Sequence, residues 1–266
     1  MHNALEKVLG GEYTVVIEEE LKKLKQSDRL LLGEPCAVLY RTDANLGRPV
    51  NECENEDKSC YIVFLPSKYG IVCNKNFESF KSADGKVKLV SLSYFIERLL
   101  EFNFTFLQLV EDKAVVWQSD AFSSIIKEYK KAVDEKDYLL ELRYKTLVSI
   151  AMSLYSDIKA GKIKNEEACK NRLFMLYVVC ETCNSIASTG KYSISNIFNE
   201  NIYNVVKSEY TEDNGMELLK QYIEKIKNCE LNVTKRDKDI DRCHRLQVKY
   251  KLVHDVTMSV LNSEEV

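Results

Sequence analysis

Residues 50–66 read VNECENEDKSCYIVFLP, and this stretch decides the fold. An acidic segment passes without a break into an apolar run at residues 60–65, which ends at Pro66. Short runs rich in β-branched and aromatic residues and bounded by proline are typical of buried strands. The acidic side chains are those of Glu52, Glu54, Glu56 and Asp57. They offer the oxygen ligands of a calcium-like ion, although acidic runs of this kind are usually exposed loops.

Helix and strand signals alternate on both sides of this stretch. Residues 36–40 and 86–90 also predict strands, and residues 114–117 are a further candidate. Residues 18–25 predict a short charged helix. Ser91 is placed to cap a second helix, because apolar residues recur at intervals of three and four from Leu92 to Leu100. The pattern predicts an α+β fold with a mixed β-sheet covered by helices.

The second part of the chain has a different character. All three prolines lie within the first 66 positions, and residues 67–266 contain none. Because proline breaks helix interiors, this asymmetry predicts an α/β core over residues 1–120. A mainly helical domain, packed on the core, is expected over residues 121–266. Its clearest helices are expected at residues 140–158, ended by Gly161, and at residues 238–261.

Composition narrows the classes of function. The chain has 266 residues and a formal net charge of −3, so it has no global positive field for nucleic acid. No window reaches ~18 apolar residues, and no signal-peptide pattern is present, so we expect a cytoplasmic protein without a membrane partner. The nine cysteines, an odd number, predict reduced thiols. Cys180 and Cys183 are expected to be small core residues of a helix rather than zinc ligands.

The order of these parts resembles nucleotidyltransferases of the polymerase-β superfamily, of the RNA-repair-associated type found in bacteria and their phages. The resemblance covers roughly residues 30–245 and rests on order and spacing more than on identity. It is carried by ENEDKSCYIVFLP at 54–66, KVKLVSLSYF at 86–95, EFNFTFLQLV at 101–110, KNRLFMLY at 170–177 and STG at 188–190. It implies a nucleotidyltransferase-like core and points to a phage-encoded protein.

The chain departs from this family at the positions that carry the chemistry. The family uses three carboxylates to hold two divalent ions, and by the resemblance Asp57 falls on the first of them. Ser59 then stands in the second position and Lys86 in the third. Asp84 could replace the third carboxylate only with a different strand register, since two residues along a strand span about 7 Å.

The phosphate-contacting positions are also altered. By strand position the family's Gly-Ser pair becomes Arg41 and Thr42, and by counting back from Asp57 it becomes Asn45 and Leu46. Thr42 keeps a hydroxyl for a nucleotide. Lys170 retains a family lysine that contacts phosphate, and it fits an ordinary surface lysine equally well. The histidine and arginine that follow it in the family are replaced by Phe174 and Tyr177.

Three hypotheses follow. In the first, the protein is a catalytically inactive relative that acts as a binding or interaction protein, with a protein partner and no cofactor. In the second, it is an active enzyme in which Mg²⁺, held by Asp57 and Asp84, supports nucleotide transfer to RNA or a small acceptor. In the third, a basic helix face binds nucleic acid. The residues of that face are Lys238, Arg242, Arg245 and Lys249. Three nearby aspartates dilute this face, and it also fits a solvated helix surface.

Overall fold

The structure is a computed structural model that describes residues 11–41, 59–101, 103–110, 114–135, 137–162 and 238–262, together with scattered residues between 176 and 225. By its internal contacts the chain forms two compact units. The first contains residues 1–42, 55–130 and 239–266, and the second contains residues 43–54 and 131–238. This division differs from the expected boundary at residue 120, because the last helix belongs to the same unit as the sheet.

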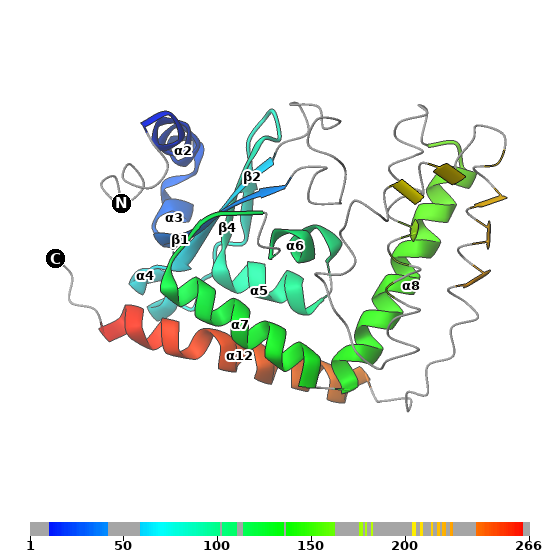
Figure 1. Cartoon of the computed structure of the whole chain (residues 1–266). Coiled ribbons are helices and arrows are strands. Elements are labelled where there is room, and N and C mark those ends of the chain that lie inside the picture. Colours follow the sequence, from blue (N-terminus) through cyan, green and yellow to red (C-terminus); the bar gives the residue numbers. More distant parts are fainter. Residues whose placement is uncertain are drawn as a thin grey trace. The chain divides into compact units, whose positions relative to one another are not determined.

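The first unit is built on a mixed five-stranded sheet (Figure 1). Its strand order is β3-β4-β2-β1-β5, in which β2 and β4 run parallel and the other neighbours run antiparallel. The strands are β1 (Leu32–Arg41), β2 (Ser59–Pro66), β3 (Ser79–Lys81), β4 (Val87–Ser91) and β5 (Val115–Gln118). The predicted α+β class and mixed sheet are therefore confirmed, and β2 coincides with the apolar run that ends at Pro66.

Pro35 lies inside β1, a strand with neighbours on both sides. Proline has no N–H group to give to a sheet ladder, so it is tolerated in such a strand only where the pairing is irregular. The register between β1 and β2 shifts on both sides of Pro35, between Leu32 and Pro35 and again before Ala37. Because the pairing is already irregular at Pro35, its missing N–H does not interrupt a regular ladder. Regular pairing continues from Ala37 to Arg41.

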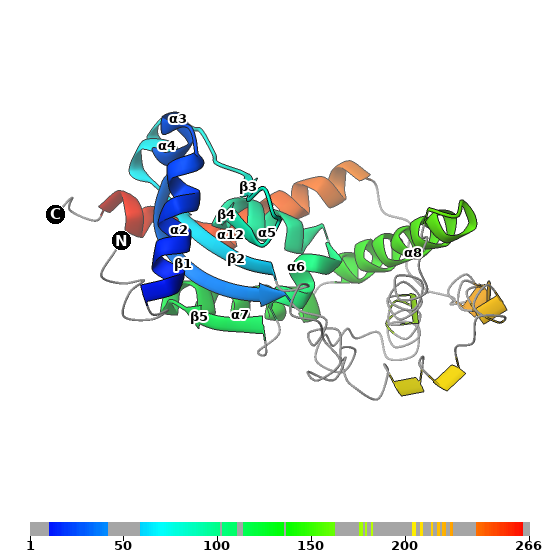
Figure 2. The same cartoon turned by 90° about the horizontal axis from the view of Figure 1, so that it is seen from above.

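Helices cover both faces of the sheet (Figure 2). On one face, α2 (Gly11–Lys23) and the residues after it pack Ile17 and Leu24 against Val38, Ile62 and Leu89. The short helices α3 (Gln26–Arg29) and α4 (Lys68–Val72) flank this layer. On the other face lie α5 (Leu92–Leu100), α6 (Phe104–Leu109) and α7 (Asp120–Glu135).

Aromatic rings join the helices of the second face. Phe95 of α5 is fully buried, with its ring centroid 5.3 Å from that of Phe106 and 5.5 Å from that of Phe122 of α7. Phe106 also meets the ring of Tyr61 on β2 at 5.9 Å. The helix begins as expected, because the Ser91 hydroxyl accepts a hydrogen bond from the Tyr94 N–H at 3.2 Å. Phe106 therefore packs between the sheet and α5.

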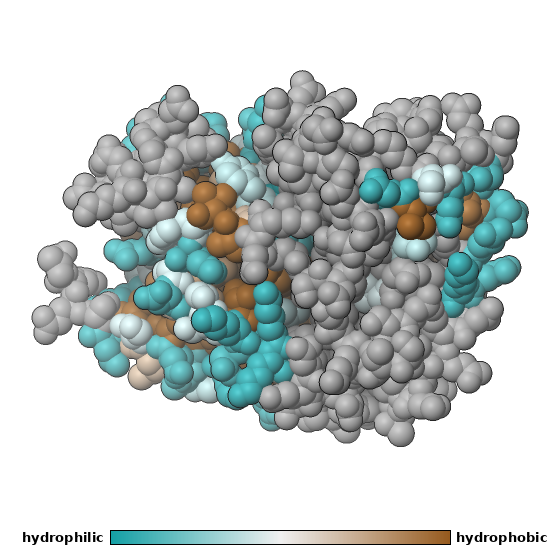
Figure 3. Space-filling view, viewed as in Figure 1, coloured by the Kyte–Doolittle hydropathy of each residue, from teal (hydrophilic) through white to brown (hydrophobic). Residues whose placement is uncertain are grey.

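After β5 all described elements are helices. In the second unit, α8 (Asp137–Lys159) buries Leu147, Ala151 and Leu154 on one side and is followed by Gly161 at φ +63°. The first unit also contains α12 (Lys238–Asn262), whose Lys249 bonds Glu97 of α5. Within the described part of the chain, no helix is both long and apolar enough to cross a membrane. Figure 3 shows hydrophobic patches separated by hydrophilic residues on one visible face of the molecule.

Candidate functional site

Three strand ends meet at one end of the sheet. β1 finishes at Arg41, which lies opposite Ser59, the first residue of antiparallel β2. Parallel β4 starts at the same end, with Val87 beside Cys60 and the Cys60 N–H donating to the Lys86 carbonyl at 2.7 Å. We call this region, with Arg41, Ser59 and Lys86 along its rim, the sheet end. It is where the sequence placed the candidate site, although Thr42 and Asp57 lie outside the described residues.

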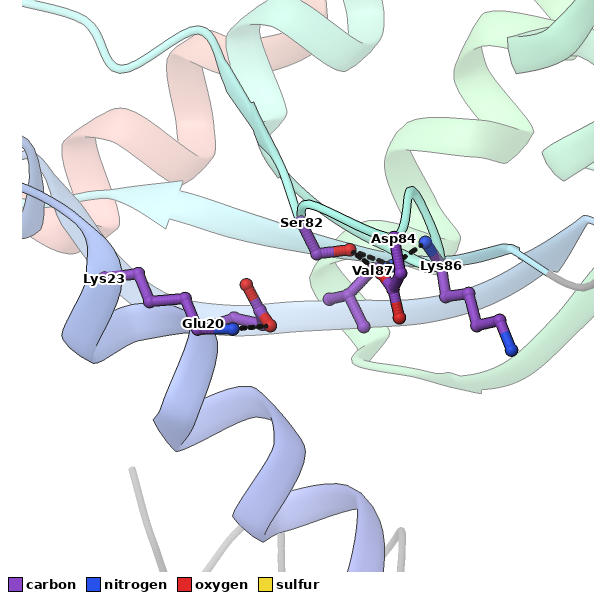
Figure 4. Close-up of polar contacts among 6 residues, drawn as sticks. All are labelled: Glu20, Lys23, Ser82, Asp84, Lys86 and Val87. Carbon is purple, nitrogen blue, oxygen red and sulfur yellow. Dashed lines mark hydrogen bonds and ion pairs between the residues drawn. The ribbon is translucent and has the colours of Figure 1, made fainter.

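Asp84 lies in the hairpin between β3 and β4 and stabilises that turn through hydrogen bonds (Figure 4). Its Oδ1 accepts a hydrogen bond from the Ser82 hydroxyl at 2.5 Å and another from the Lys86 N–H at 3.0 Å. The Ser82 oxygen in turn accepts from the Val87 N–H at 2.9 Å. Gly85 has φ +74°, a conformation that favours glycine. Asp84 therefore fixes the loop that leads into β4.

The electrostatic state of Asp84 agrees with this structural role. The Ser82 hydroxyl, followed by the Lys86 N–H and the nearby Lys86 ammonium, holds the pKa of Asp84 below its usual value. Hydrogen bonds to a carboxylate stabilise its charged form. Nearby on α2, Lys23 donates to Glu20 at 2.5 Å, and this bond raises the pKa of Lys23 (Figure 4). The Asp84 charge is thus already compensated by groups of the protein.

The described residues of the sheet end do not fit a Mg²⁺ site. Mg²⁺ prefers several oxygen ligands in a near-octahedral arrangement. Here Ser59 and Lys86 occupy neighbouring strand positions, and the Asp84 oxygen that faces the turn already accepts two hydrogen bonds. In the described part of the chain, no group of three or more His, Cys, Asp or Glu side chains could hold a metal ion.

Three cationic side chains lie at or next to the sheet end, where Lys86 is also close to the Asp84 carboxylate. Arg41 and Lys86 lie on the rim, and Lys88 follows Lys86 on the same face of β4, because side chains alternate along a strand. The Lys88 ammonium donates to the Tyr61 hydroxyl at 2.6 Å and lies 4.6 Å from the centre of that ring. A cluster of like charge favours a ligand of opposite charge.

Gln108 of α6 supports this cluster, and the sequence analysis did not single it out. Its Oε1 accepts a hydrogen bond from Arg41 Nε at 3.0 Å, and the residue is fully buried. Within the described structure its Nε2 is buried without a hydrogen-bond partner. Buried amides are normally satisfied, so an unpaired donor is unusual. The available signal was a single amide within the otherwise apolar end of FTFLQL at 104–109.

The cysteines of the first unit provide no reactive group near the sheet end. Cys60 on β2 is buried, and burial raises the pKa of its thiol to about 12. Burial also raises the pKa of Cys36 on β1. Reactive cysteines require a stabilised thiolate, which burial in apolar surroundings disfavours. Cys36, Cys60, Cys73 and Cys243 are free thiols, whereas Cys180 and Cys183 lie outside the described residues.

The C-terminal basic face lies partly against another helix. Lys249 of α12 donates to Glu97 of α5 at 2.8 Å. Arg245 and Lys249 line a groove of about 220 Å³ together with Glu97, Leu100, Glu101 and Leu246. The side chains of Lys238 and Arg242, and all of Lys170, lie outside the described residues. Two of the four proposed nucleic-acid contacts therefore face acidic side chains of the protein itself.

Comparisons with known proteins give a structural similarity. No protein-family model matches the chain, and no curated protein matches it. The chain is similar to a crystallised nucleotidyltransferase-like protein from Exiguobacterium sibiricum, with a TM-score of 0.29 and 8% sequence identity. The similarity covers 90% of this chain and 79% of that one. At this score the likeness carries no argument about activity, so the function is inferred from the residues.

Proposed function

We propose that this protein is a catalytically inactive, nucleotidyltransferase-like binding protein, and that its sheet end takes an anionic ligand without transferring a nucleotide. One observation carries the proposal. The sequence resemblance to polymerase-β-superfamily nucleotidyltransferases places metal-binding carboxylates at positions 59 and 86, among others. These two positions hold Ser59 and Lys86, and the Asp84 carboxylate is hydrogen-bonded within a turn. A lysine close to a divalent cation repels it, whereas the same lysine attracts a phosphate.

The neighbouring cations support a phosphate-bearing ligand in particular. Arg41 is oriented by its bond to Gln108, and Lys88 is held by Tyr61. Guanidinium groups match phosphate oxygens with several donors, and ammonium groups act as compact positive charges. Such a site could hold the phosphates of a nucleotide or of an RNA end by direct hydrogen bonds. The protein partner expected from the sequence would then recognise a different surface.

Catalysis is tested by incubating the full chain with a labelled nucleoside triphosphate, Mg²⁺ or Mn²⁺, and an RNA acceptor. We expect no incorporation above background, and no change in the Asp57→Ala variant. Metal-dependent incorporation that disappears in Asp57→Ala would overturn the proposal and establish the active alternative.

Binding is tested with a fluorescent nucleoside triphosphate in the presence of EDTA. We expect metal-independent binding that weakens about tenfold or more in Lys86→Gln and Arg41→Gln, because each loses a hydrogen bond to a charged group worth about 1.5–3 kcal/mol. Lys22→Gln, on the helix that covers the opposite face, is the control and should bind normally. Binding that requires Mg²⁺ and Asp57 would contradict the proposal. Melting temperatures should show that Arg41→Gln remains folded, since that substitution also releases Gln108.

A further inference from the structure

Helix α12 buries Leu252 toward the rest of its unit and leaves a second row of apolar side chains exposed to solvent. Lys249 is 22% exposed and bonds Glu97, and Leu252 is buried. In contrast, Leu246, Tyr250 and Met258 are 56%, 65% and 41% exposed. Amphipathic helices usually carry polar side chains on the side that faces solvent. The exposed row is therefore an apolar surface without a partner in the described structure.

The exposed residues form a continuous row. Leu246, Tyr250, His254 and Met258 are spaced by four positions, and we call this row the outer ridge. Residues four apart lie on the same side of a helix, so the ridge spans about 18 Å along the axis. The rings of Tyr250 and His254 lie 5.0 Å apart and connect the middle of the row. Rows of this spacing are the ridges that pack into grooves of another helix.

Charges beside the ridge indicate what covers it. Lys251 is exposed. Four positions further along the same flank, the Asp255 side chain is 99% exposed, and its Oδ1 lies 3.1 Å from Nδ1 of His254 in the same helix. When two identical helices pack antiparallel about a two-fold axis near residue 253, Lys251 of each copy lies opposite Asp255 of the other. The flank is therefore complementary to itself, and a two-fold interface uses such a pairing twice.

We propose that the outer ridge of α12 is a self-association surface, on which a second copy of this chain packs antiparallel. The contacts consist of the apolar ridge in the centre and the Lys251–Asp255 pairs on the flank. This inference does not depend on the function of the sheet end, because none of its residues belongs to that region.

The test is sedimentation equilibrium of the full chain over a wide concentration range. We expect the wild type to form dimers, and Tyr250→Glu to weaken dimerisation by at least tenfold, since the substitution places two charges in the interface. Tyr250 is largely exposed in the single chain, so circular dichroism should be unchanged. Lys22→Glu on α2 is the matched charge control and should dimerise normally. A wild type that stays monomeric at all concentrations overturns the proposal.

Charge reversal identifies the antiparallel arrangement. Lys251→Glu and Asp255→Lys should each weaken the dimer about tenfold, because each replaces two attractive pairs with two repulsive ones. The double variant, Lys251→Glu with Asp255→Lys, should restore wild-type affinity. Single variants without effect, or a double variant weaker than both, would overturn the pairing.

Discussion

At the scale of single residues, a few side chains at the sheet end determine which kind of ligand the region can bind. Asp84 has the carboxylate of a metal ligand, but this carboxylate accepts hydrogen bonds from the Ser82 hydroxyl and the Lys86 N–H, and these bonds fix the hairpin. Lys86 presents positive charge where the resemblance implies the third carboxylate, and Arg41 adds a second positive charge on the same rim. Residue identity at these positions favours anion binding over metal binding.

The hydrogen bonds of Asp84 predict a pH dependence of stability. The folded pKa of Asp84 lies below its usual value of 3.8. Its contribution to folding is therefore fully present above that value and is lost as the pH falls through the folded pKa. We expect Asp84→Asn to be less stable than the wild type at pH 7 and to lose less stability between pH 5 and pH 2. Urea unfolding at a series of pH values measures both effects.

Asp120→Asn is the control for this experiment, because Asp120 is an exposed acid at the start of α7, outside the hairpin. The same change in pH dependence in both variants would assign the effect to net charge rather than to the turn.

At the scale of elements, local patterns predicted most of the first unit. The apolar run at residues 60–65 predicted β2. Ser91, followed by apolar residues at intervals of three and four, predicted α5. The spacing of residues along α12 could not predict which side of this helix faces the rest of the unit. Cys243, Gln247 and Tyr250, spaced by four and three positions, are all exposed. The orientation of α12 involves contacts such as that of Lys249 with Glu97 of the distant helix α5, which no local pattern contains.

The aromatic junction of α5, α6 and α7 predicts a large stability effect. Phe95 is fully buried between Phe106 and Phe122. We expect Phe95→Ala to lower the free energy of unfolding by about 3–5 kcal/mol, because it removes buried apolar area and leaves a cavity. Tyr69→Ala, at a site 48% exposed, should change it by less than about 0.5 kcal/mol. Chemical denaturation measures both. Equal losses in the two variants would contradict the assigned core.

At the scale of the whole molecule, the first unit combines three separate segments of the chain. Proline placement predicted a mixed first part and a helical second part, and the helices after β5 agree with that. It could not show that α12 returns to the sheet-containing unit. That return depends on contacts such as Lys249 with Glu97, which join residues 152 positions apart. Pairing at such a separation leaves no periodic signal in a single sequence.

The return of α12 predicts an energetic coupling between Lys249 and Glu97. Both side chains are partly exposed, at 22% and 47%. A double-mutant cycle with Lys249→Met and Glu97→Gln should therefore give a favourable coupling of about 0.2–1 kcal/mol in unfolding experiments. The coupling should decrease in 1 M salt, where surface charges are screened. Strict additivity of the two substitutions at low salt would show that α12 does not rest on α5 through this pair.

The position of α12 also sets an order of events during synthesis. The sheet and α5 are made early, whereas the helix that supplies Lys249 and Leu252 follows only after residues 131–238 of the second unit. Until then, the α5 surface that faces the groove has no cover from α12. Contacts that close large loops form slowly, so docking of α12 is expected to be a late step. A nascent chain would therefore expose Leu100 and the neighbouring acids of α5 to chaperones throughout the translation of its second unit.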